Sequence, residues 1–309
     1  MKKITRIIVI SLLAALGLAI VAATSLAALI QKDKDFDISS SEATLSPTPD
    51  YGQNYLNNLI FLGDFTSQNM VSSGVLENGV DSNQVWTGKN GTLSLDYNID
   101  KATIILPETD EEMLLTQALK TKKPRYLVIT LGLENGVPYC DKQAFCEYYR
   151  KLIDKVKESS PSTKIIIQSI LPVTAKFQRK NSEITNEKID TCNKWLCELA
   201  EEMNIRFLNT AECLKDSSGN LPKKHASEDG SSPNTEGYKI MLEYIRTHGY
   251  KDYPMVDKHT ESPTQVPTQS LPHKSPQKHL QSQELKQSNT NRRMPKHPPI
   301  FLLVKLIRN

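Results

Sequence analysis

Residues 126–136 read Tyr-Leu-Val-Ile-Thr-Leu-Gly-Leu-Glu-Asn-Gly, a mostly apolar run that ends in a glycine-containing turn. An unbroken apolar run of this length is typical of a strand buried on both faces of a sheet. Comparable runs lie on both sides of it along the chain. We expect strands at Leu59–Leu62, Ala102–Leu106, Tyr126–Leu131, Lys164–Ile170 and Ile205–Leu208.

Stretches with helical periodicity separate most of these runs. They lie around residues 110–120, 141–158, 183–204 and 235–247. Buried strands that alternate with helices favour a parallel sheet covered on both faces. The sequence therefore predicts a three-layer, flavodoxin-like α/β domain over residues 57–250, and such folds place ligand sites at the carboxyl ends of their strands.

The N-terminus has the pattern of a targeting segment. Lys2, Lys3 and Arg6 precede the uncharged run 7–30, which as a helix would measure about 36 Å against a hydrocarbon core of roughly 30 Å. This length favours an uncleaved signal anchor, whereas Ser25-Leu26-Ala27 is a site that a signal peptidase could cut. In either case we expect an extracytoplasmic domain, attached to the cell membrane by one pass or secreted.

The segments that flank the predicted domain differ from it in composition. Residues 31–56 are polar and include two prolines, so we expect a spacer. Residues 251–309 carry 10 Lys and Arg against 4 Asp and Glu and are rich in Pro, Gln and Ser, which predicts a disordered tail. Residues 31–250 carry 25 basic against 31 acidic side chains, and this net-acidic body argues against nucleic acid as a partner.

Five cysteines follow the targeting segment, at positions 140, 146, 192, 197 and 213. Their spacings match neither a zinc ribbon nor a Cys-x-x-Cys redox motif. Two disulfides with one remaining thiol and five buried free thiols fit the sequence equally well. The chain also has no P-loop and no dinucleotide fingerprint, so we predict no cofactor.

Four short blocks are informative: the first and third follow predicted strands, the second lies between two of them, and the fourth opens the last helix. They are Gly63-Asp64-Phe65-Thr66, Thr87-Gly88-Lys89-Asn90-Gly91, Gly132-Leu133-Glu134-Asn135-Gly136 and Asp229-Gly230-Ser231-Ser232-Pro233-Asn234-Thr235-Glu236-Gly237-Tyr238. In content and order they resemble the blocks of the SGNH (GDSL-type) hydrolases, mostly esterases and acetylesterases. The resemblance covers roughly residues 57–248 and implies an SGNH-hydrolase-like fold.

The chain departs from the family pattern at three positions that the resemblance marks as catalytic. Phe65 stands where the family has its nucleophilic serine, and Ser232 stands where it has its histidine. In the third block, Glu134 occupies the position of the oxyanion-binding asparagine, and Asn135 follows one residue later.

Two family positions are retained. Asp229 is the residue that would orient the histidine, and Gly88 is our choice for the glycine that donates a backbone N–H, ahead of Gly91.

These departures remove the chemistry of ester hydrolysis. Acyl transfer needs an attacking oxygen and a base to take its proton, and Phe65 and Ser232 supply neither. A carboxylate at Glu134 would place negative charge where the oxyanion forms, at a site where loss of one donor already costs about 2.7–4 kcal/mol. We therefore expect no intact catalytic set.

Substitutes for the missing groups lie nearby in the sequence. Thr66 and Ser67 carry hydroxyls, but a threonine at a helix start usually caps or packs. His225 lies in a polar loop, where a solvated side chain is the usual case, and His248 follows the last helix, where a contact with the helix C-terminus is usual.

A binding role makes a different use of the same residues. Asp64, Glu134 and Asp229 could converge on a hard cation or on glycan hydroxyls, although a hydrogen-bonded Asp64 and a solvated Glu134 are the more ordinary arrangement. The predicted ligand-binding residues are Asp64, Thr66, Gly88, Glu134, Asn135, Asp229 and Asn234.

The sequence thus favours a degenerate SGNH-like domain that binds cell-envelope carbohydrate or an acylated ligand, with no metal assigned. An esterase with a non-standard residue set is the first alternative. A protein–protein interaction module is the second.

Overall fold

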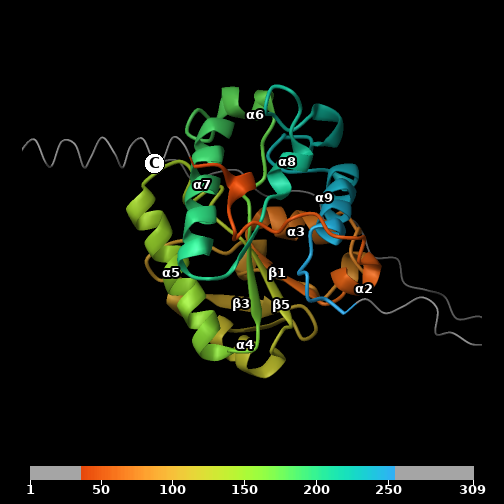
Figure 1. Cartoon of the computed structure of the whole chain (residues 1–309), viewed down its shortest axis with the longest axis vertical. Coiled ribbons are helices and arrows are strands. Elements are labelled where there is room, and N and C mark those ends of the chain that lie inside the picture. The colour runs from red at the N-terminus through yellow and green to blue at the C-terminus, as the bar shows by residue number, and fades with distance from the viewer. Residues whose placement is uncertain (1–35, 255–309) are drawn as a thin grey trace, which may run out of the picture. The chain divides into compact units, whose positions relative to one another are not determined.

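The computed structural model describes residues 36–254. A five-stranded sheet, in which every neighbouring pair is parallel, runs in the order β2-β1-β5-β6-β7 (Figure 1). Its strands are β1 (Leu59–Gly63), β2 (Val85–Trp86), β5 (Tyr126–Thr130), β6 (Lys164–Gln168) and β7 (Arg206–Leu208). The antiparallel pair β3 (Thr103–Leu106) and β4 (Glu111–Leu114) forms a second, two-stranded sheet.

Helices lie on both faces of the central sheet. The α-helices of the described residues are α2 (Gly52–Leu56), α3 (Phe65–Ser72), α4 (Leu115–Lys122), α5 (Lys142–Ser159), α6 (Ala175–Lys180), α7 (Asn186–Glu202), α8 (Thr210–Leu214) and α9 (Thr235–Thr247). Short 3-10 turns occur at Ile38–Ser40, Gly79–Asp81, Lys89–Gly91, Ile99–Lys101 and Lys223–His225.

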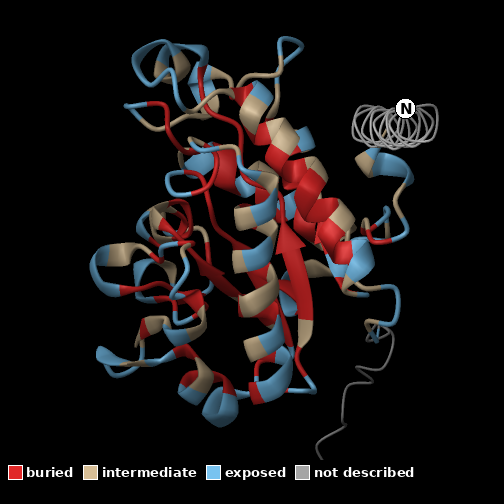
Figure 2. Ribbon diagram, turned by 90° about the vertical axis from the view of Figure 1, so that its left-hand side faces the viewer, coloured by how far each residue is buried: buried red, intermediate tan, exposed pale blue. Residues whose placement is uncertain are grey.

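The layers follow from the alternation of side chains along each strand. In β5, Leu127 and Ile129 pack into one apolar cluster with α5 and α7, whereas Tyr126 and Val128 pack into a second cluster with α3 and α9. Figure 2 shows the strands and the inner faces of the helices as buried. The predicted three-layer α/β fold is confirmed.

Most predicted elements are present, with three differences. Ala102–Leu106 contributes a strand, but it pairs with β4 outside the parallel sheet. The stretch 110–120 is not one helix, because strand β4 occupies its start and α4 begins at Leu115. Strand β2 was not predicted, since two residues carry no periodicity.

Residues 36–56 pack against the domain instead of forming the predicted spacer. Leu45 donates its N–H to the carbonyl of Phe207 (2.8 Å), and Phe207 donates its own to the carbonyl of Ala43 (2.9 Å), so this segment extends the sheet beyond β7. Tyr55 and Leu56 are buried. The predicted anchor (1–30) and residues 255–309 of the predicted tail lie outside the described residues.

Two further observations concern membrane contact and cysteine chemistry. Within residues 36–254, no helix has the length and apolar character needed to cross a bilayer. All five cysteines are free thiols.

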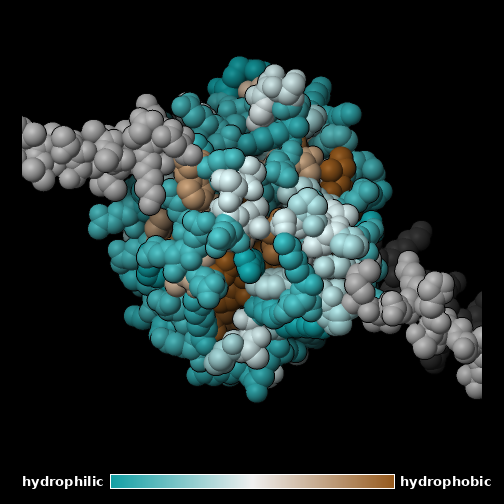
Figure 3. Space-filling model, viewed as in Figure 1, coloured by the Kyte–Doolittle hydropathy of each residue, from teal (hydrophilic) through white to brown (hydrophobic). Residues whose placement is uncertain are grey.

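The face seen in Figure 3 is mostly hydrophilic, and apolar atoms appear there only in small patches.

Candidate functional site

The first block forms the turn between β1 and α3. Asp64 is the N-cap of α3, and its Oδ1 accepts hydrogen bonds from the Thr66 N–H (3.0 Å) and the Thr66 hydroxyl (2.7 Å). Gly63 is required here because a Cβ would lie 2.0 Å from the Ser67 Oγ. Phe65 is the first residue of α3, half-buried against the apolar cluster on the α5 side of the sheet.

Asp64 is a buried carboxyl group with a perturbed acidity. Burial raises its pKa to about 6, against the hydrogen bonds from Thr66, which lower it. The charge of Glu134 raises the pKa further, and the Leu133 N–H lowers it by donating to the carboxylate. The first and third blocks are therefore neighbours, as the resemblance implies.

The last block also reaches α3. Ser232 is fully buried, and its Oγ accepts a hydrogen bond from the Asn69 side-chain amide (3.1 Å). The Tyr238 hydroxyl donates to the carbonyl of Thr66 (2.6 Å). Ser232 thus faces the helix that Phe65 begins, which is the relation that a catalytic histidine and serine would need, but it holds a packed hydroxyl.

Asp229 does not orient any ring. Its carboxylate accepts from the Ser227 hydroxyl (2.7 Å) and from the N–H and hydroxyl of Ser231 (3.0 and 2.9 Å) within one exposed turn. Partial burial raises its pKa, but these hydrogen bonds outweigh that effect, and the net pKa is lowered. The retained Asp229 therefore stabilises its own turn through these hydrogen bonds.

The second block also lies against α3. The Thr87 hydroxyl donates to the Gln68 side-chain oxygen (3.2 Å), and the buried Gly88 follows directly. A Cβ on Gly88 would lie 2.2 Å from the carbonyl oxygen of Thr92, so this position accepts only glycine. Gly91, the less favoured choice, has a positive φ of 75° and packs on Gln68.

All four blocks therefore meet around α3, but two predicted ligand-binding side chains are engaged elsewhere. Asn234 caps α9, where its Oδ1 accepts from the Gly237 N–H (3.0 Å) and its amide donates to the Lys224 carbonyl (2.9 Å). Thr66 is buried, with its hydroxyl bonded to Asp64. Both side chains therefore already have hydrogen-bond partners within the protein.

The carboxylates do not assemble into a cation site. Asp64 is buried, whereas Glu134 and Asp229 are exposed. Among residues 36–254 no group of three or more histidine, cysteine or acidic side chains could hold a metal ion.

None of the nearby substitutes is placed for catalysis. Ser67 is buried against Gly63. The His225 backbone carbonyl accepts from the Asn234 N–H (2.9 Å), and its ring Nδ1 is buried without a partner. His248 caps α9, with its ring stacked on Tyr244 at 3.7 Å and its Nδ1 3.0 Å from the Tyr244 carbonyl, which fits the expected contact with the helix C-terminus.

A groove of about 390 Å³ opens beside the third block. Asn135 lies on its rim, where its amide donates to the Ser94 hydroxyl (3.3 Å). Tyr139, which is 77% exposed, also lines the groove. The sequence reasoning missed the other lining residues, which are Ser94, Leu95, Asp96, Gly136, Tyr139, Asp141, Ala144, Phe145 and Tyr148. A search for aromatic residues just after the third block would have found Tyr139.

The GDSL-like lipase/acylhydrolase family model matches residues 68–240. This match spans more than half of the chain, so the chain belongs to the GDSL-like lipase/acylhydrolase family. It begins just after Phe65 and Thr66, which places the altered first block outside the matched stretch. Comparison with curated protein sequences gives no match.

The solved structures that this chain resembles are distant from it in sequence. A Streptococcus pneumonia protein provisionally described as a platelet activating factor is 18% identical, covers 74% of this chain and 97% of its own, and has a TM-score of 0.42. A Bacteroides fragilis protein provisionally described as an acylhydrolase is 16% identical (70% and 91% covered, TM-score 0.43). The periplasmic domain of the Salmonella ser. Paratyphi A lipopolysaccharide acetyltransferase is 18% identical (61% and 82%, TM-score 0.42).

Proposed function

We propose that this chain is a ligand-binding member of the GDSL-like family that has lost ester hydrolysis and works outside the cytoplasmic membrane. The observation that carries the proposal is the position of Phe65. It stands first in α3, at the turn where the family nucleophile belongs, and a benzyl group has no atom that can attack an acyl carbon.

The rest of the site supports the same conclusion. Ser232, at the histidine position, is enclosed and hydrogen-bonded to Asn69, and the Asp229 carboxylate is satisfied by its own turn. Glu134 adds negative charge next to Asp64, where an oxyanion would be destabilised. The nucleophile, the base and the oxyanion-binding asparagine are missing from three positions of blocks that meet around α3.

The groove beside Asn135 supports carbohydrate as the ligand. An exposed tyrosine such as Tyr139 gives an apolar face for a sugar ring. Asp96 and Asp141 each accept one backbone N–H through Oδ1, and the other oxygen of each carboxylate provides an acceptor for the sugar hydroxyls. The N-terminal signal in the sequence supports a cell-envelope location, where such ligands are exposed. A reporter enzyme that is active only outside the cytoplasm, fused after residue 254, tests the location.

Loss of hydrolysis is tested with a serine-directed fluorophosphonate and an acetate ester reporter. We expect neither labelling nor turnover by the purified chain. Labelling at Thr66 or Ser67 that disappears with its substitution to alanine would contradict the proposal and favour an esterase with a non-standard residue set.

Partial restoration sharpens this test. The double variant Phe65→Ser/Ser232→His should gain weak esterase activity, whereas Phe65→Ser alone, its matched control, should gain none. Because Ser232 is fully buried, the imidazole must displace its neighbours, at a cost of about 1–3 kcal/mol. Equal activity in the single and double variants would show that the positions are wrongly assigned.

Carbohydrate binding is tested by calorimetry with chitotetraose and cellotetraose. Tyr139→Ala should weaken binding by roughly tenfold, because it removes the most exposed aromatic ring of the groove. Tyr97→Ala is the matched control, since Tyr97 is 69% exposed and does not line the groove. Absence of binding to both sugars, or an equal loss in the two variants, would contradict a sugar site here.

A further inference from the structure

A second pocket, of about 540 Å³, lies away from the four family blocks. It is built at the edge of the sheet where β7 begins, from the N-terminal segment, the start of β7 and the chain after α9. Arg206, the first residue of β7, lies at the amino end of its strand, whereas the family blocks lie at the carboxyl ends. None of the four family blocks contributes a residue to the pocket.

Most of this pocket is made by parts of the chain outside the family match. Of the 15 residues that line it, only Arg206 and Glu212 fall within residues 68–240. The others come from residues 39–47 and 244–252. The pocket is thus a feature of this chain's flanking segments and not of the family core.

Two cations line the pocket without a carboxylate partner. The Arg206 guanidinium donates from Nη1 to the backbone carbonyl of Glu42 (2.6 Å), and none of the ion pairs among residues 36–254 includes it. Lys251 is exposed and likewise forms no ion pair with a described residue. An unpaired guanidinium and ammonium in one concave site attract a phosphate or carboxylate.

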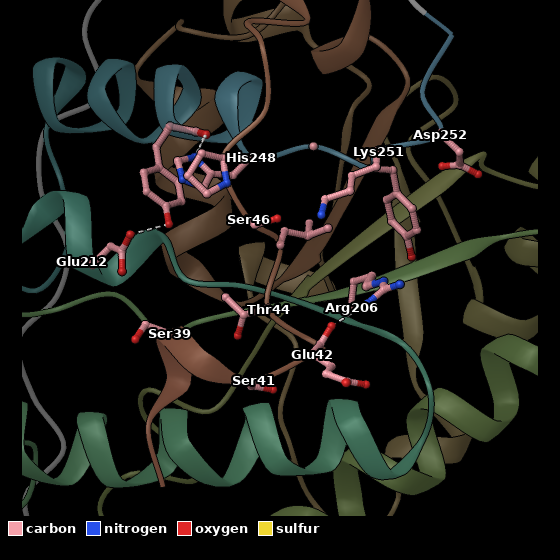
Figure 4. Close-up of a pocket in the computed structure, with 15 residues that line it drawn as sticks. Ser39, Ser41, Glu42, Thr44, Ser46, Arg206, Glu212, His248, Lys251 and Asp252 are labelled. Carbon is pink, nitrogen blue, oxygen red and sulfur yellow. Dashed lines mark hydrogen bonds between the residues drawn. The ribbon is translucent and has the colours of Figure 1, made fainter.

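Two of the three acidic side chains of the pocket are engaged by other groups. Glu212 accepts from the Tyr244 hydroxyl (2.6 Å) and from the Asn209 amide (2.8 Å), and Asp252 forms an ion pair with Lys164. Glu212 keeps its charge, because both groups bonded to it are neutral, and it lies with His248 across the pocket from Arg206 and Lys251 (Figure 4). On the side of the two cations, Glu42 is the one lining carboxylate without a described partner for its side chain, so the two cations exceed the free acidic charge there.

The wall of the pocket opposite Arg206 and Lys251 is lined by aromatic rings. His248 stacks on Tyr244 with the ring planes only 5° apart, and both line the pocket. Figure 4 shows His248 and Glu212 on one side, Arg206 and Lys251 on the other, and Thr44 and Ser46 between them. The Thr44 hydroxyl donates to the Ile38 carbonyl (2.6 Å), which leaves Ser46 as the hydroxyl between the two walls. A hydroxylated ring that carries one anionic group matches an aromatic wall that faces two cations.

From this arrangement we propose that the pocket between the N-terminal segment, β7 and the end of α9 binds a sugar that carries a phosphate or carboxylate group. The anion lies at Arg206 and Lys251, and the ring lies against His248. This site goes beyond the proposed function and does not depend on it, because it shares no residue with the groove at Asn135.

The test uses the full chain and titration calorimetry with glucose 6-phosphate, glucuronate, glucose and inorganic phosphate. We expect glucose 6-phosphate or glucuronate to bind at least roughly tenfold more tightly than glucose and than inorganic phosphate. Whichever of the two anionic sugars binds more tightly identifies the anionic group. Absence of binding by both anionic sugars would overturn the proposal. Equal affinities for glucose and both anionic sugars, or inorganic phosphate binding as tightly as either of them, would overturn it too.

Two variants locate the site. Lys251→Gln and Arg206→Gln should each weaken binding of the anionic sugar by roughly fivefold or more and leave the affinity for glucose unchanged. Lys251 is exposed and forms no described ion pair, so its variant remains informative if loss of Arg206 loosens the N-terminal segment. Arg179→Gln, at an exposed arginine of α6, is the matched control and should bind as the parent does. Unchanged affinity in both pocket variants would refute the assignment.

Discussion

The buried carboxyl group of Asp64 allows a quantitative test of the site's electrostatics. Its pKa in the folded chain is about 6, against an ordinary value of 3.8. Between pH 3.8 and about 6, Asp64 is ionised in the unfolded chain but still protonated in the folded chain. Its contribution to the free energy of unfolding therefore falls as the pH rises. A difference of about two pKa units corresponds to about 3 kcal/mol, present below about pH 4 and lost once the pH has passed through about 6.

Asp64→Asn removes this titration and keeps an oxygen that can cap α3. We therefore expect the free energy of unfolding of the variant, relative to that of the parent, to rise by about 3 kcal/mol as the pH rises from about 4 to about 8. The reason is that only the parent must ionise a buried carboxyl group. Urea unfolding at a series of pH values, followed by the fluorescence of the buried Trp86 and Trp195, measures both proteins.

Asp229→Asn is the matched control for this experiment. Asp229 is exposed and its pKa is lowered, so its contribution is present at neutral pH and is lost as the pH falls. The two variants should therefore differ from the parent with opposite pH dependence. If the difference between Asp64→Asn and the parent stays constant with pH, or changes in the opposite direction, the assigned burial of Asp64 is wrong.

Three further predictions concern how the site is held together. Tyr238→Phe removes the hydroxyl that donates to the Thr66 carbonyl and should lower the free energy of unfolding by about 1–2 kcal/mol, measured in urea. Gly230→Ala should lower the Tm by several degrees in calorimetry, because φ is +83° and a Cβ would lie 2.1 Å from a threonine hydroxyl. Cys140 and Cys192 are within hydrogen-bonding reach of each other, so oxidised glutathione should link them, as shown by peptide mass mapping. A bridge that closes a loop of about 50 residues should stabilise the chain by up to about 4 kcal/mol.

The sequence predicts the central strands and the long helices well, because their patterns report burial directly. Tyr126–Leu131 and Lys164–Ile170 differ from β5 and β6 only at their ends, and the predicted helix 235–247 has the bounds of α9. An apolar pattern does not indicate, however, which other strand a strand pairs with. The run 102–106 therefore predicts a strand of the parallel sheet, although it pairs antiparallel with Glu111–Leu114 and donates one further hydrogen bond, from Ile105, to the Thr87 carbonyl (2.9 Å).

Composition misled the prediction for the N-terminal segment. Residues 31–56 are polar on average, but Ala43, Leu45 and Tyr55 are buried because they face the sheet edge or α9. A few anchoring side chains among many solvated ones leave no periodic signal. Their burial is decided by strand β7 and helix α9, which lie far along the chain.

At the candidate site, the sequence indicates that the blocks lie together at one end of the sheet. It does not indicate how buried each side chain is or what it bonds to. Asp64 was expected to bond loop backbone and does so. The fourth block predicts ligand binding for Asn234, whereas its position before α9 makes it an N-cap. The second pocket was beyond sequence reasoning, because it joins residues near 40 with residues near 250.

The N-terminal segment beside β7 has a practical consequence for work with shorter fragments. A fragment that begins at residue 57, as the composition suggests, would leave the backbone N–H and carbonyl of Phe207 unpaired along an open strand. An edge strand with unpaired backbone groups can pair with strands of other molecules, and this pairing promotes aggregation. Soluble material should therefore retain residues 36–56, which act as a built-in cover for the sheet.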